Sequence, residues 1–341
     1  MNIAVDAMGG DHGPEVIVRG AVEAATESGL SVTLVGDGEA VDRAFRAHEE
    51  NQRVTVCHCD QAVGMDEPPL KALRSKPQAS IRVAFDLVKR GLADAVVSAG
   101  NSGATFAAGL LLLGKVKGVE RPALASIFPG RRGEVLLLDV GANVDCRPVH
   151  LLQFGVMGQA FAAACLDIED PKVGLLSIGE EGGKGNEQVR KAYELFKVGG
   201  LNFVGNVEGR DLFSGEVPVV VCDGFVGNVA LKVSEGMSDA VASMLRQELG
   251  RTAAGRLAMI LGRPAMERLR KTLDYETYGG APILGINGVG LVCHGSSSAR
   301  AIKNAVIRAA EYAGNNFQDK LSRRMSELAS GGETVQMEGA Q

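Results

Sequence analysis

The sequence lacks tryptophan, an excess of basic residues and any long apolar run. Its formal net charge is -5, whereas a protein that neutralises nucleic-acid phosphates normally carries a basic balance. The most apolar segment, residues 107–114, is far shorter than the roughly 20 residues that a membrane-spanning helix needs. We therefore expect neither a nucleic-acid-binding protein nor an integral membrane protein.

The chain also lacks the signs of export, of a disulfide framework and of a metal site. Its first six residues enter a strand pattern directly, without the charged segment and apolar stretch of a signal peptide. The six cysteines fall mostly within apolar runs, where a free cysteine acts as a small core residue. Cys57-His58-Cys59 resembles a ligand cluster, but a closed zinc site needs four ligands and no second pair accompanies it. We expect a cytoplasmic protein without a bound metal.

Glycine is abundant instead, with 45 residues. It permits tight turns and a close approach of the backbone to a ligand, so we expect loops that bind ligands through main-chain N–H groups. Hydrophobic residues make up 45% of the chain, which is enough for a substantial core.

Short apolar runs alternate with stretches of helical periodicity along most of the chain. Many of these runs are continuously apolar, as is typical of strands buried on both faces of a parallel sheet. The pattern predicts an α/β protein with an open, doubly wound sheet and helices on both faces, in three layers. The predicted strands are residues 3–5, 32–35, 54–56, 95–98, 136–138, 173–176, 202–204 and 219–221, with helices at 15–26 and 39–48 between the first three.

Two helical stretches in the second half do not match the sheet pattern. Apolar residues at helical spacing predict one long helix over residues 226–250 that projects beyond the sheet. A second stretch over residues 258–273 is interrupted by a glycine and a proline, so residues 226–275 are predicted to form a protruding helical hairpin that could pair with another chain. We expect a single α/β catalytic domain over residues 1–330 and, because its hydrophobicity is low, a disordered tail over residues 331–341.

Polar, glycine-rich segments follow several of the predicted strands. In open α/β sheets ligands collect beyond the carboxyl ends of the strands, where loops lead into helix N-termini. We therefore predict that five such segments lie on one edge of the sheet and converge on one site. They are residues 6–13, 98–103, 139–143, 178–187 and 222–228.

The segment IGEEGGKGNE, residues 178–187, resembles a phosphate loop but departs from it at one position. A nucleotide-binding P-loop has Ser or Thr after its lysine to hold Mg2+, and here Gly185 follows Lys184. The glycine-rich backbone and the cation remain, so the segment predicts an anion site without a nucleotide–metal complex. The alternative interpretation is an exposed, flexible loop.

Together the five segments offer main-chain N–H groups, helix N-termini, one lysine and several asparagines. This set suits a phosphate and a carbonyl oxygen that becomes negative during a reaction. The sequence shows no G-x-S-x-G elbow, no evident Cys–His pair and no G-x-G-x-x-G after the first strand, so we expect neither a covalent hydrolase nor a Rossmann dinucleotide site. Each asparagine or aspartate alone could equally cap a helix or hold a loop.

Eight motifs, in order along nearly the whole chain, carry a resemblance to a known family. They are DAMGGD (residues 6–11), SAGNSGA (98–104), RPAL (121–124), LDVGAN (138–143), KGN (184–186), GNVEG (205–209), CDGFVGN (222–228) and YGGA (278–281). The set is similar to that of the PlsX family, the bacterial phosphate acyltransferases.

The resemblance implies transfer of a fatty acyl group from acyl carrier protein to inorganic phosphate, which gives acyl phosphate for phospholipid (phosphatidic acid) synthesis. It implies a fold like those of phosphate acetyltransferase and isopropylmalate dehydrogenase, a homodimer and no cofactor. It also implies a cytoplasmic enzyme that associates loosely with the inner face of the membrane, where a membrane acyltransferase consumes acyl phosphate.

Residues and resemblance together support a mechanism without an acyl-enzyme. Phosphate held by backbone amides and Lys184 would attack the thioester carbonyl directly, and Lys184 or Asn228 would meet the oxyanion. Lys184 and Asn228 are therefore the predicted catalytic residues. The predicted substrate-binding residues are Asp6, Gly9, Gly10, Asn101, Ser102, Asn143, Gly185, Asn186 and Asp223.

A basic and apolar stretch lies on the predicted hairpin. Such a mixture can dock an acidic carrier protein or lie on anionic lipid, although it could also be the solvated face of a pair of dimer helices. The predicted contacts with carrier protein or membrane are Arg251, Arg256, Arg263, Leu257 and Ile260.

Three other functions remain open on the sequence alone. A coenzyme A-dependent phosphotransacetylase would share the architecture and the anion loops. An NAD-dependent decarboxylating dehydrogenase of the related fold should bring a tight group of metal-binding carboxylates, whereas Asp139 and Asp223 are separated among glycines and asparagines. A non-catalytic acyl-phosphate-binding protein would keep the anion loops and show no turnover.

Overall fold

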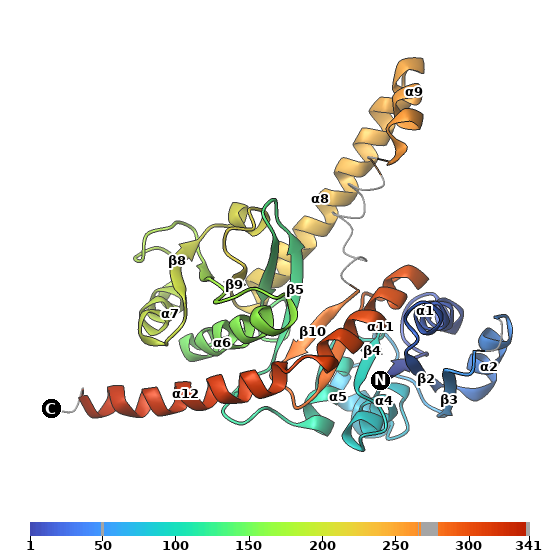
Figure 1. Cartoon of the computed structure of the whole chain (residues 1–341), viewed down its shortest axis with the longest axis horizontal. Coiled ribbons are helices and arrows are strands. Elements are labelled where there is room, and N and C mark those ends of the chain that lie inside the picture. The colour runs from blue at the N-terminus through green and yellow to red at the C-terminus, as the bar shows by residue number, and fades with distance from the viewer. Residues whose placement is uncertain (49–50, 265, 267–278, 339–341) are drawn as a thin grey trace.

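The computed structural model describes residues 1–48, 51–264, 266 and 279–338, and its strands join in one 11-stranded sheet (Figure 1). The strands are β1 (Asn2–Asp6), β2 (Ser31–Gly36), β3 (Val54–His58), β4 (Ala95–Ser98), β5 (Ala123–Pro129), β6 (Glu134–Leu138), β7 (Val173–Leu176), β8 (Phe203–Val207), β9 (Val219–Val221), β10 (Ala281–Leu284) and β11 (Val289–Val292). Their order across the sheet is β3-β2-β1-β4-β11-β10-β5-β6-β9-β7-β8. All the predicted strands are present, and the structure adds β5, β10 and β11.

Helices cover both faces of this sheet, which confirms the three predicted layers (Figure 1). They are α1 (Gly13–Ser28), α2 (Gly38–Arg46), α3 (Pro69–Ser75), α4 (Ser80–Lys89), α5 (Ser102–Leu113), α6 (Pro148–Cys165), α7 (Glu187–Val198), the 3-10 helix η1 (Gly209–Phe213), α8 (Gly224–Gly250), α9 (Ala253–Leu261), α11 (Ala299–Gly314) and α12 (Phe317–Glu338). Strand side chains alternate between two apolar clusters, because successive residues of a strand face opposite sides. Ile3 belongs to the cluster of α1, α6 and α11, whereas Ala4 belongs to the cluster of α4 and α5.

The two halves of the sheet run in opposite directions, so the expectation of a single ligand edge is wrong. β1, β4 and β11 are mutually parallel, but the pairings β11–β10, β10–β5 and β5–β6 are all antiparallel. The strands β6, β9 and β7, which are parallel to one another, therefore point opposite to β1 and β4. The five polar segments separate into a first loop group (residues 6–13 and 98–103) and a second loop group (residues 139–143, 178–187 and 222–228). The two groups follow oppositely directed strands and do not share an edge.

α8 projects from the body of the protein, and α9 folds back against its far end (Figure 1). α9 begins at Ala253, earlier than predicted, because Thr252 caps it: Thr252 Oγ1 accepts a hydrogen bond from Gly255 N at 3.0 Å. The rest of the predicted hairpin, from residue 267 to residue 275, lies outside the described residues. In the described part of the chain, no helix combines the length and the apolar character that crossing a membrane requires.

α12 differs from the expectation of a disordered tail. It runs to Glu338, so residues 331–338 are helical, and residues 339–341 lie outside the described residues. Its beginning is anchored, since Phe317 and Leu321 are buried and the ring of Phe317 packs edge-on against that of Phe161. Once a first turn is held in this way, each further residue adds a backbone hydrogen bond at little cost, which allows a polar segment to extend the helix.

Candidate active site

The first loop group is organised by Asp6, which is only 4% exposed at the end of β1. Its carboxylate accepts hydrogen bonds from Ser98 Oγ at 2.7 Å and from Met8 N at 3.3 Å. Burial raises the pKa of Asp6, and these hydrogen bonds act against that rise. Asp6 therefore ties the ends of β1 and β4 together from inside the protein.

Gly9 and Gly10 allow the loop after β1 to pack closely against its neighbours. A Cβ on Gly9 would lie 2.4 Å from Gly100 N, so no side chain fits at this position. Gly10 has φ +91°, a left-handed conformation that residues with side chains rarely adopt. Asp11 N donates to Gly295 O at 2.8 Å, so the loop after β11 joins the same group.

Asn101 and Ser102 both lie at the start of α5 but differ in what their side chains bond. Asn101 Oδ1 accepts from Ala104 N at 3.0 Å, and its Nδ2 donates to Met65 O at 2.8 Å, so Asn101 caps α5 and holds the neighbouring loop. Ser102 is exposed, and within the described residues we find no hydrogen bond from its hydroxyl. Of the predicted site residues in this group, Ser102 has the side chain that is free to meet a ligand.

The second loop group is organised by Asp139, which is fully buried at the end of β6. Its carboxylate accepts hydrogen bonds of 2.6–3.3 Å from the main-chain N–H groups of residues 124 and 141–143 and from Asn143 Nδ2. Burial raises the pKa of Asp139, and these donors act against that rise. Asn143 Nδ2 also donates to Pro122 O at 2.8 Å, so both of its amide hydrogens bind inside the protein and hold the loop.

β9 leads into α8 beside this loop. Asp223 is the N-cap of α8, and its Oδ1 accepts a main-chain hydrogen bond of 2.9 Å from the first turn. Gly224 N donates to Asn143 O at 2.8 Å, which joins the start of α8 to the loop after β6. Asn228 is exposed in the next turn, and a Cβ on Gly141 would lie 3.5 Å from its Oδ1. No hydrogen bond of the Asn228 side chain is found among the described residues, so its amide is left unbonded beside this loop.

β7 leads into the glycine-rich segment that carries Lys184. Lys184 N donates to Glu181 O at 2.9 Å and closes a tight turn, after which Gly185 adopts φ +98°. Asn186 caps α7, because its Oδ1 accepts from Val189 N at 2.9 Å. The Lys184 side chain is exposed, and its Nζ has no ion pair or hydrogen bond to any residue that the structure describes.

Lys184 and Asn228 emerge from neighbouring strands that point the same way. β9 pairs in parallel with both β6 and β7, so the loops after these three strands leave from one edge. The N-termini of α7 and α8 lie at this edge, and the positive end of a helix dipole favours an anion. The second loop group therefore combines a free cation, a free amide and two helix N-termini.

His150, at the start of α6, was not among the predicted site residues. Its ring is buried; Nδ1 accepts from Arg147 N at 3.0 Å, and Nε2 lies 3.2 Å from Glu120 Oε2. Arg147 Nε donates to the same Nε2 at 3.3 Å, so the guanidinium of Arg147 and the carboxylate of Glu120 both contact this ring nitrogen. Burial lowers the pKa of His150, and the charges of Arg121 and Arg147 lower it further, whereas Glu120 raises it. Nothing in the local sequence pattern marks this histidine.

Asn206 on β8 was also absent from the predicted site, although it lies in the family motif GNVEG. It is 6% exposed, and its Nδ2 donates to Glu181 O at 2.8 Å in the segment that carries Lys184. The motif was the available signal, and the contact itself depends on a strand pairing that the sequence does not display.

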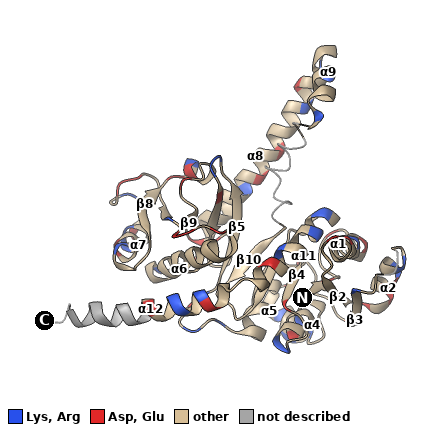
Figure 2. Cartoon of the chain, in the orientation of Figure 1, with Lys and Arg blue, Asp and Glu red and all other residues tan. Residues whose placement is uncertain are grey.

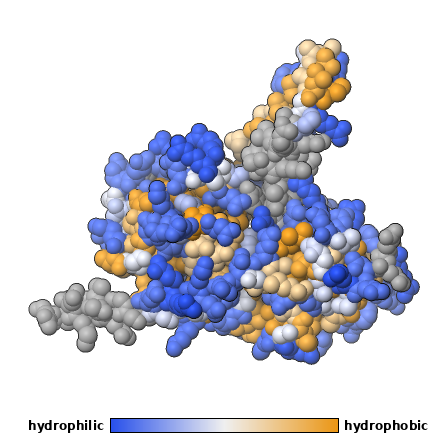
Figure 3. All heavy atoms as spheres, viewed as in Figure 1, coloured by the Kyte–Doolittle hydropathy of each residue, from blue (hydrophilic) through white to orange (hydrophobic). Residues whose placement is uncertain are grey.

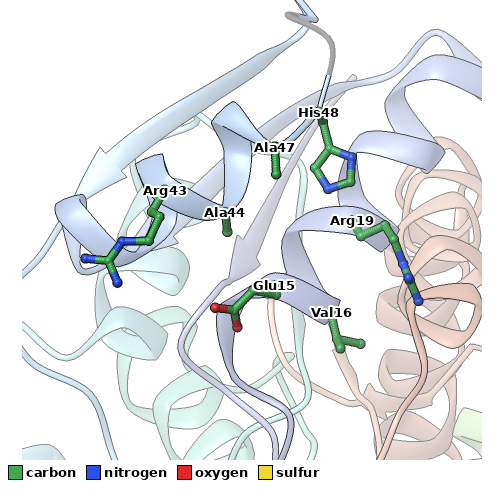
Figure 4. Close-up of a pocket in the computed structure, with 7 residues that line it drawn as sticks. All are labelled: Glu15, Val16, Arg19, Arg43, Ala44, Ala47 and His48. Atoms are coloured by element: carbon green, nitrogen blue, oxygen red, sulfur yellow. The ribbon is translucent and has the colours of Figure 1, made fainter.

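A pocket lies between α1 and α2 (Figure 4). It is lined by Glu15, Val16, Arg19, Arg43, Ala44, Ala47 and His48, none of which belongs to the predicted site. Among the described residues, no group of three or more His, Cys, Asp and Glu side chains is placed to hold a metal ion.

The predicted contacts on the hairpin gather at its tip. Leu257 and Ile260 are 56% and 70% exposed, and Figure 3 shows hydrophobic residues at the far end of this projection. Arg251 pairs with Glu248 at 2.7 Å, Arg256 donates to Gly250 O at 3.0 Å, and Arg263 also has an interaction partner. Charges of both signs lie along α8 (Figure 2).

Comparison with known proteins identifies close relatives over the whole length. Residues 1–320 match the family described as fatty acid synthesis protein. The chain is 51% identical over 328 residues to a phosphate acyltransferase of Geotalea daltonii, covering 96% of this chain and 95% of that protein. It is 52% identical over 312 residues to a phosphate acyltransferase of Nitratidesulfovibrio vulgaris, covering 91% and 90%.

Solved structures share the fold. A phosphotransacetylase from Streptococcus pyogenes matches with a TM-score of 0.61 and 22% identity over 92% of this chain and 94% of that one. A 4-hydroxythreonine-4-phosphate dehydrogenase from Klebsiella pneumoniae matches with a TM-score of 0.55 and 14% identity over 92% and 99%. At these identities the likeness concerns the fold alone, and it confirms the predicted phosphotransacetylase-like architecture. The chain therefore belongs to the fatty acid synthesis protein family, the PlsX family of phosphate acyltransferases, and is an acyltransferase.

Proposed function

We propose that this acyltransferase transfers a fatty acyl group from acyl carrier protein to inorganic phosphate, and that the reaction takes place at the second loop group. The name of the relatives, phosphate acyltransferase, supports phosphate as the acceptor, and the family description supports a fatty acyl donor. The observation that carries the placement is exposed Lys184, whose Nζ is unpaired among the described residues and which shares an edge with Asn228. The product, acyl phosphate, supplies phosphatidic acid synthesis through a membrane acyltransferase.

In the proposed mechanism, phosphate binds at the N-terminus of α7, where main-chain N–H groups and Lys184 meet its charge. A phosphate oxygen attacks the carbonyl carbon of the thioester, and the carbonyl oxygen becomes an oxyanion that Lys184 or Asn228 stabilises. The C–S bond then breaks, and the proton of hydrogenphosphate ends on the leaving thiol. Phosphate is a competent nucleophile at neutral pH, so the protein contributes position and charge stabilisation, and no acyl-enzyme forms.

The other predicted substrate-binding residues fall into three groups, according to whether their side chains are hydrogen-bonded within the protein, absent or free. The residues that shape the site through loop and cap hydrogen bonds are Asp6, Asn101, Asn143, Asn186 and Asp223. The glycines Gly9, Gly10 and Gly185 let main chain approach main chain or ligand. Ser102 offers a hydroxyl from the first loop group.

A comparison of donors tests this function. Acyl-acyl carrier protein and acyl-coenzyme A are each supplied with inorganic phosphate, and acyl phosphate is trapped with hydroxylamine as the hydroxamate. We expect product from the carrier-protein thioester, dependent on phosphate, and no protein-bound acyl group when phosphate is omitted. A preference for the coenzyme A thioester would instead indicate a phosphotransacetylase, and no product from either donor would indicate a non-catalytic binding protein.

The proposal includes a homodimer formed through α8. Val229, Val233, Met237, Val241 and Met244 follow one another at helical spacing and are between 47% and 63% exposed. An apolar stripe of this kind normally packs against another helix, and the same stripe of a second copy is its proposed partner.

Lysine at Val233 and Met237 should convert the dimer to monomers in sedimentation equilibrium. Asp239→Lys, at an exposed polar position of the same helix, should not.

The tip of the hairpin is the proposed contact with acyl carrier protein or with the inner face of the membrane. Exposed Leu257 and Ile260 supply apolar surface, and Arg251 and Arg256 lie beside them with basic charge. Replacing both arginines with glutamate should weaken binding to carrier protein or sedimentation with anionic vesicles. If neither binding changes, the stretch is structural.

A further inference from the structure

The family motif at residues 205–209 has no role in the mechanism above, yet its Asn206 contacts the turn that carries Lys184. Asn206 Nδ2 donates to Glu181 O at 2.8 Å. The same carbonyl oxygen accepts the hydrogen bond of 2.9 Å from Lys184 N that closes the turn. One oxygen atom therefore joins a buried side chain of β8 to the main chain of Lys184.

A second link between these segments is weak by comparison. Arg210 Nη2 lies 3.6 Å from Glu180 Oε1, and the two side chains are 73% and 70% exposed. Ion pairs this exposed are screened by solvent and hold a loop poorly. Asn206, at 6% exposure, is a side-chain link that solvent does not weaken, and it reaches further into the turn than the main-chain hydrogen bond of 2.8 Å from Ser177 N to Val207 O.

The Asn206 amide is poorly suited to a purely structural role. Its Oδ1 is buried and has no hydrogen-bond partner within the described protein, and the same is true of Ser177 Oγ, next to Gly185. A buried polar atom without a partner opposes folding and offsets what the Nδ2 hydrogen bond contributes. An apolar side chain of the same shape would remove both the Nδ2 donor and the unpartnered oxygen, so we expect little net change in stability. The amide is better explained by what it orients.

We propose that Asn206 is a positioning residue that fixes the location of Lys184 through the carbonyl of Glu181. This inference rests on the proposed function of Lys184 and extends it to the strand behind the loop. Asn206 itself does not contact substrate. A misplacement of a reacting group by about 1 Å lowers turnover by roughly 100-fold, so loss of this hydrogen bond should appear in kcat.

Asn206→Leu tests the proposal, because leucine has nearly the same shape and removes both the donor and the unpartnered oxygen. We expect kcat for acyl-phosphate formation to fall roughly 10- to 100-fold while the thermal midpoint stays near that of the unchanged protein. Asn206→Ala removes the same donor without added bulk and should give the same loss. Asn202→Leu is the matched control, since Asn202 Nδ2 donates to Asp170 O at 2.9 Å, before the start of β8 and away from Lys184, and its kcat should not change.

A double-mutant cycle with Lys184→Ala separates positioning from general damage. If Asn206 acts through Lys184, Asn206→Leu should cause no further loss of kcat in a Lys184→Ala background. The inference would be overturned if the two losses multiply in the double variant. It would also be overturned if both Asn206 variants keep full activity while Lys184→Ala is impaired. Either result would leave the proposed function intact. Near-unchanged activity of Lys184→Ala would overturn the proposed role of Lys184 and this inference with it.

Discussion

The two loop groups are built in the same way but differ in which side chains they leave without hydrogen bonds to the protein. Each ends a strand with a buried aspartate, Asp6 in the first and Asp139 in the second, and each places an Asn or Asp cap on a neighbouring helix. In the first group the predicted site residue with a free side chain is Ser102. In the second group a cation and an amide remain free, and two helix N-termini lie beside them.

This difference shows that residue type does not identify a site residue. Asn143 and Asn228 are both asparagines in glycine-containing segments of the second loop group. The two amide hydrogens of Asn143 bind Asp139 and Pro122 O, so its side chain serves the fold. Asn228 is exposed and unbonded among the described residues, so its side chain can serve a substrate.

The largest effect that sharpens this comparison is expected from Asn228→Ala. Removing one donor to an oxyanion typically lowers kcat by about 100-fold or more, and Asn228 is a proposed donor. The measurement is hydroxamate formation from acyl-acyl carrier protein. Lys232→Ala, one turn further along exposed α8, is the control and should keep its activity. Equal activity of the two variants would remove Asn228 from the chemistry.

The two buried aspartates should differ in their contribution to stability. Asp139→Asn places an NH2 group against main-chain N–H donors that cannot turn away, and we expect the free energy of unfolding to fall by about 2 to 4 kcal/mol. Asp6→Asn should cost less, about 1 to 2 kcal/mol, because the amide oxygen can still accept from Ser98 Oγ and the contact that is lost, with Met8 N, is long at 3.3 Å. Urea unfolding of both variants measures the difference, and equal losses would contradict it.

Ser102→Ala asks whether the first loop group takes part in the reaction. A hydroxyl that bonds nothing in the protein can add about one neutral hydrogen bond to a substrate, so kcat/KM should fall by less than about tenfold. A loss as large as that of Asn228→Ala would place the chemistry across both groups and end the contrast between them.

The smallest effect is the pH dependence of stability at His150. Burial lowers the pKa of His150 in the folded protein below its ordinary value of 6.5. As the pH falls, His150 is therefore protonated in the unfolded chain before it is protonated in the folded protein. The contribution of His150 to stability is therefore present above about pH 6.5 and declines below it, by at most about 1.4 kcal/mol per pH unit. Unfolding curves between about pH 7.5 and about pH 5.5 should show this decline in the unchanged protein and less of it in His150→Gln. If stability changes with pH equally in the unchanged protein and in His150→Gln, His150 has the same pKa in the folded and unfolded states, which would contradict the prediction.

The fold was largely predictable because its strands are continuous apolar runs. Two of the three missed strands are weak patterns: β10 contains Pro282, and β11 contains Gly290. These short strands, with β5, carry the antiparallel pairings that reverse half of the sheet. Strand direction is set by pairing between distant segments, so the division into two loop groups could not be predicted from local pattern.

The candidate site was predictable in composition and less so in the roles of its members. Glycines and polar residues after the strands indicated the loops, and Lys184 was recognised as a lone cation among glycines, with an exposed, flexible loop as the alternative. Whether an amide faces inward, as at Asn143 and Asn206, depends on partners far along the chain. The sequence does not display those contacts.

The most direct test of the central claim measures acyl phosphate made from acyl-acyl carrier protein and radiolabelled inorganic phosphate by Lys184→Ala and by Lys191→Ala. Lys191 is an exposed lysine on α7 that pairs with Glu187 at 2.6 Å, so its loss controls for charge. The account predicts that Lys184→Ala loses most of its activity, by about 100-fold or more, while remaining folded, and that Lys191→Ala stays near the unchanged enzyme. Equal and near-full activity of both variants would contradict it.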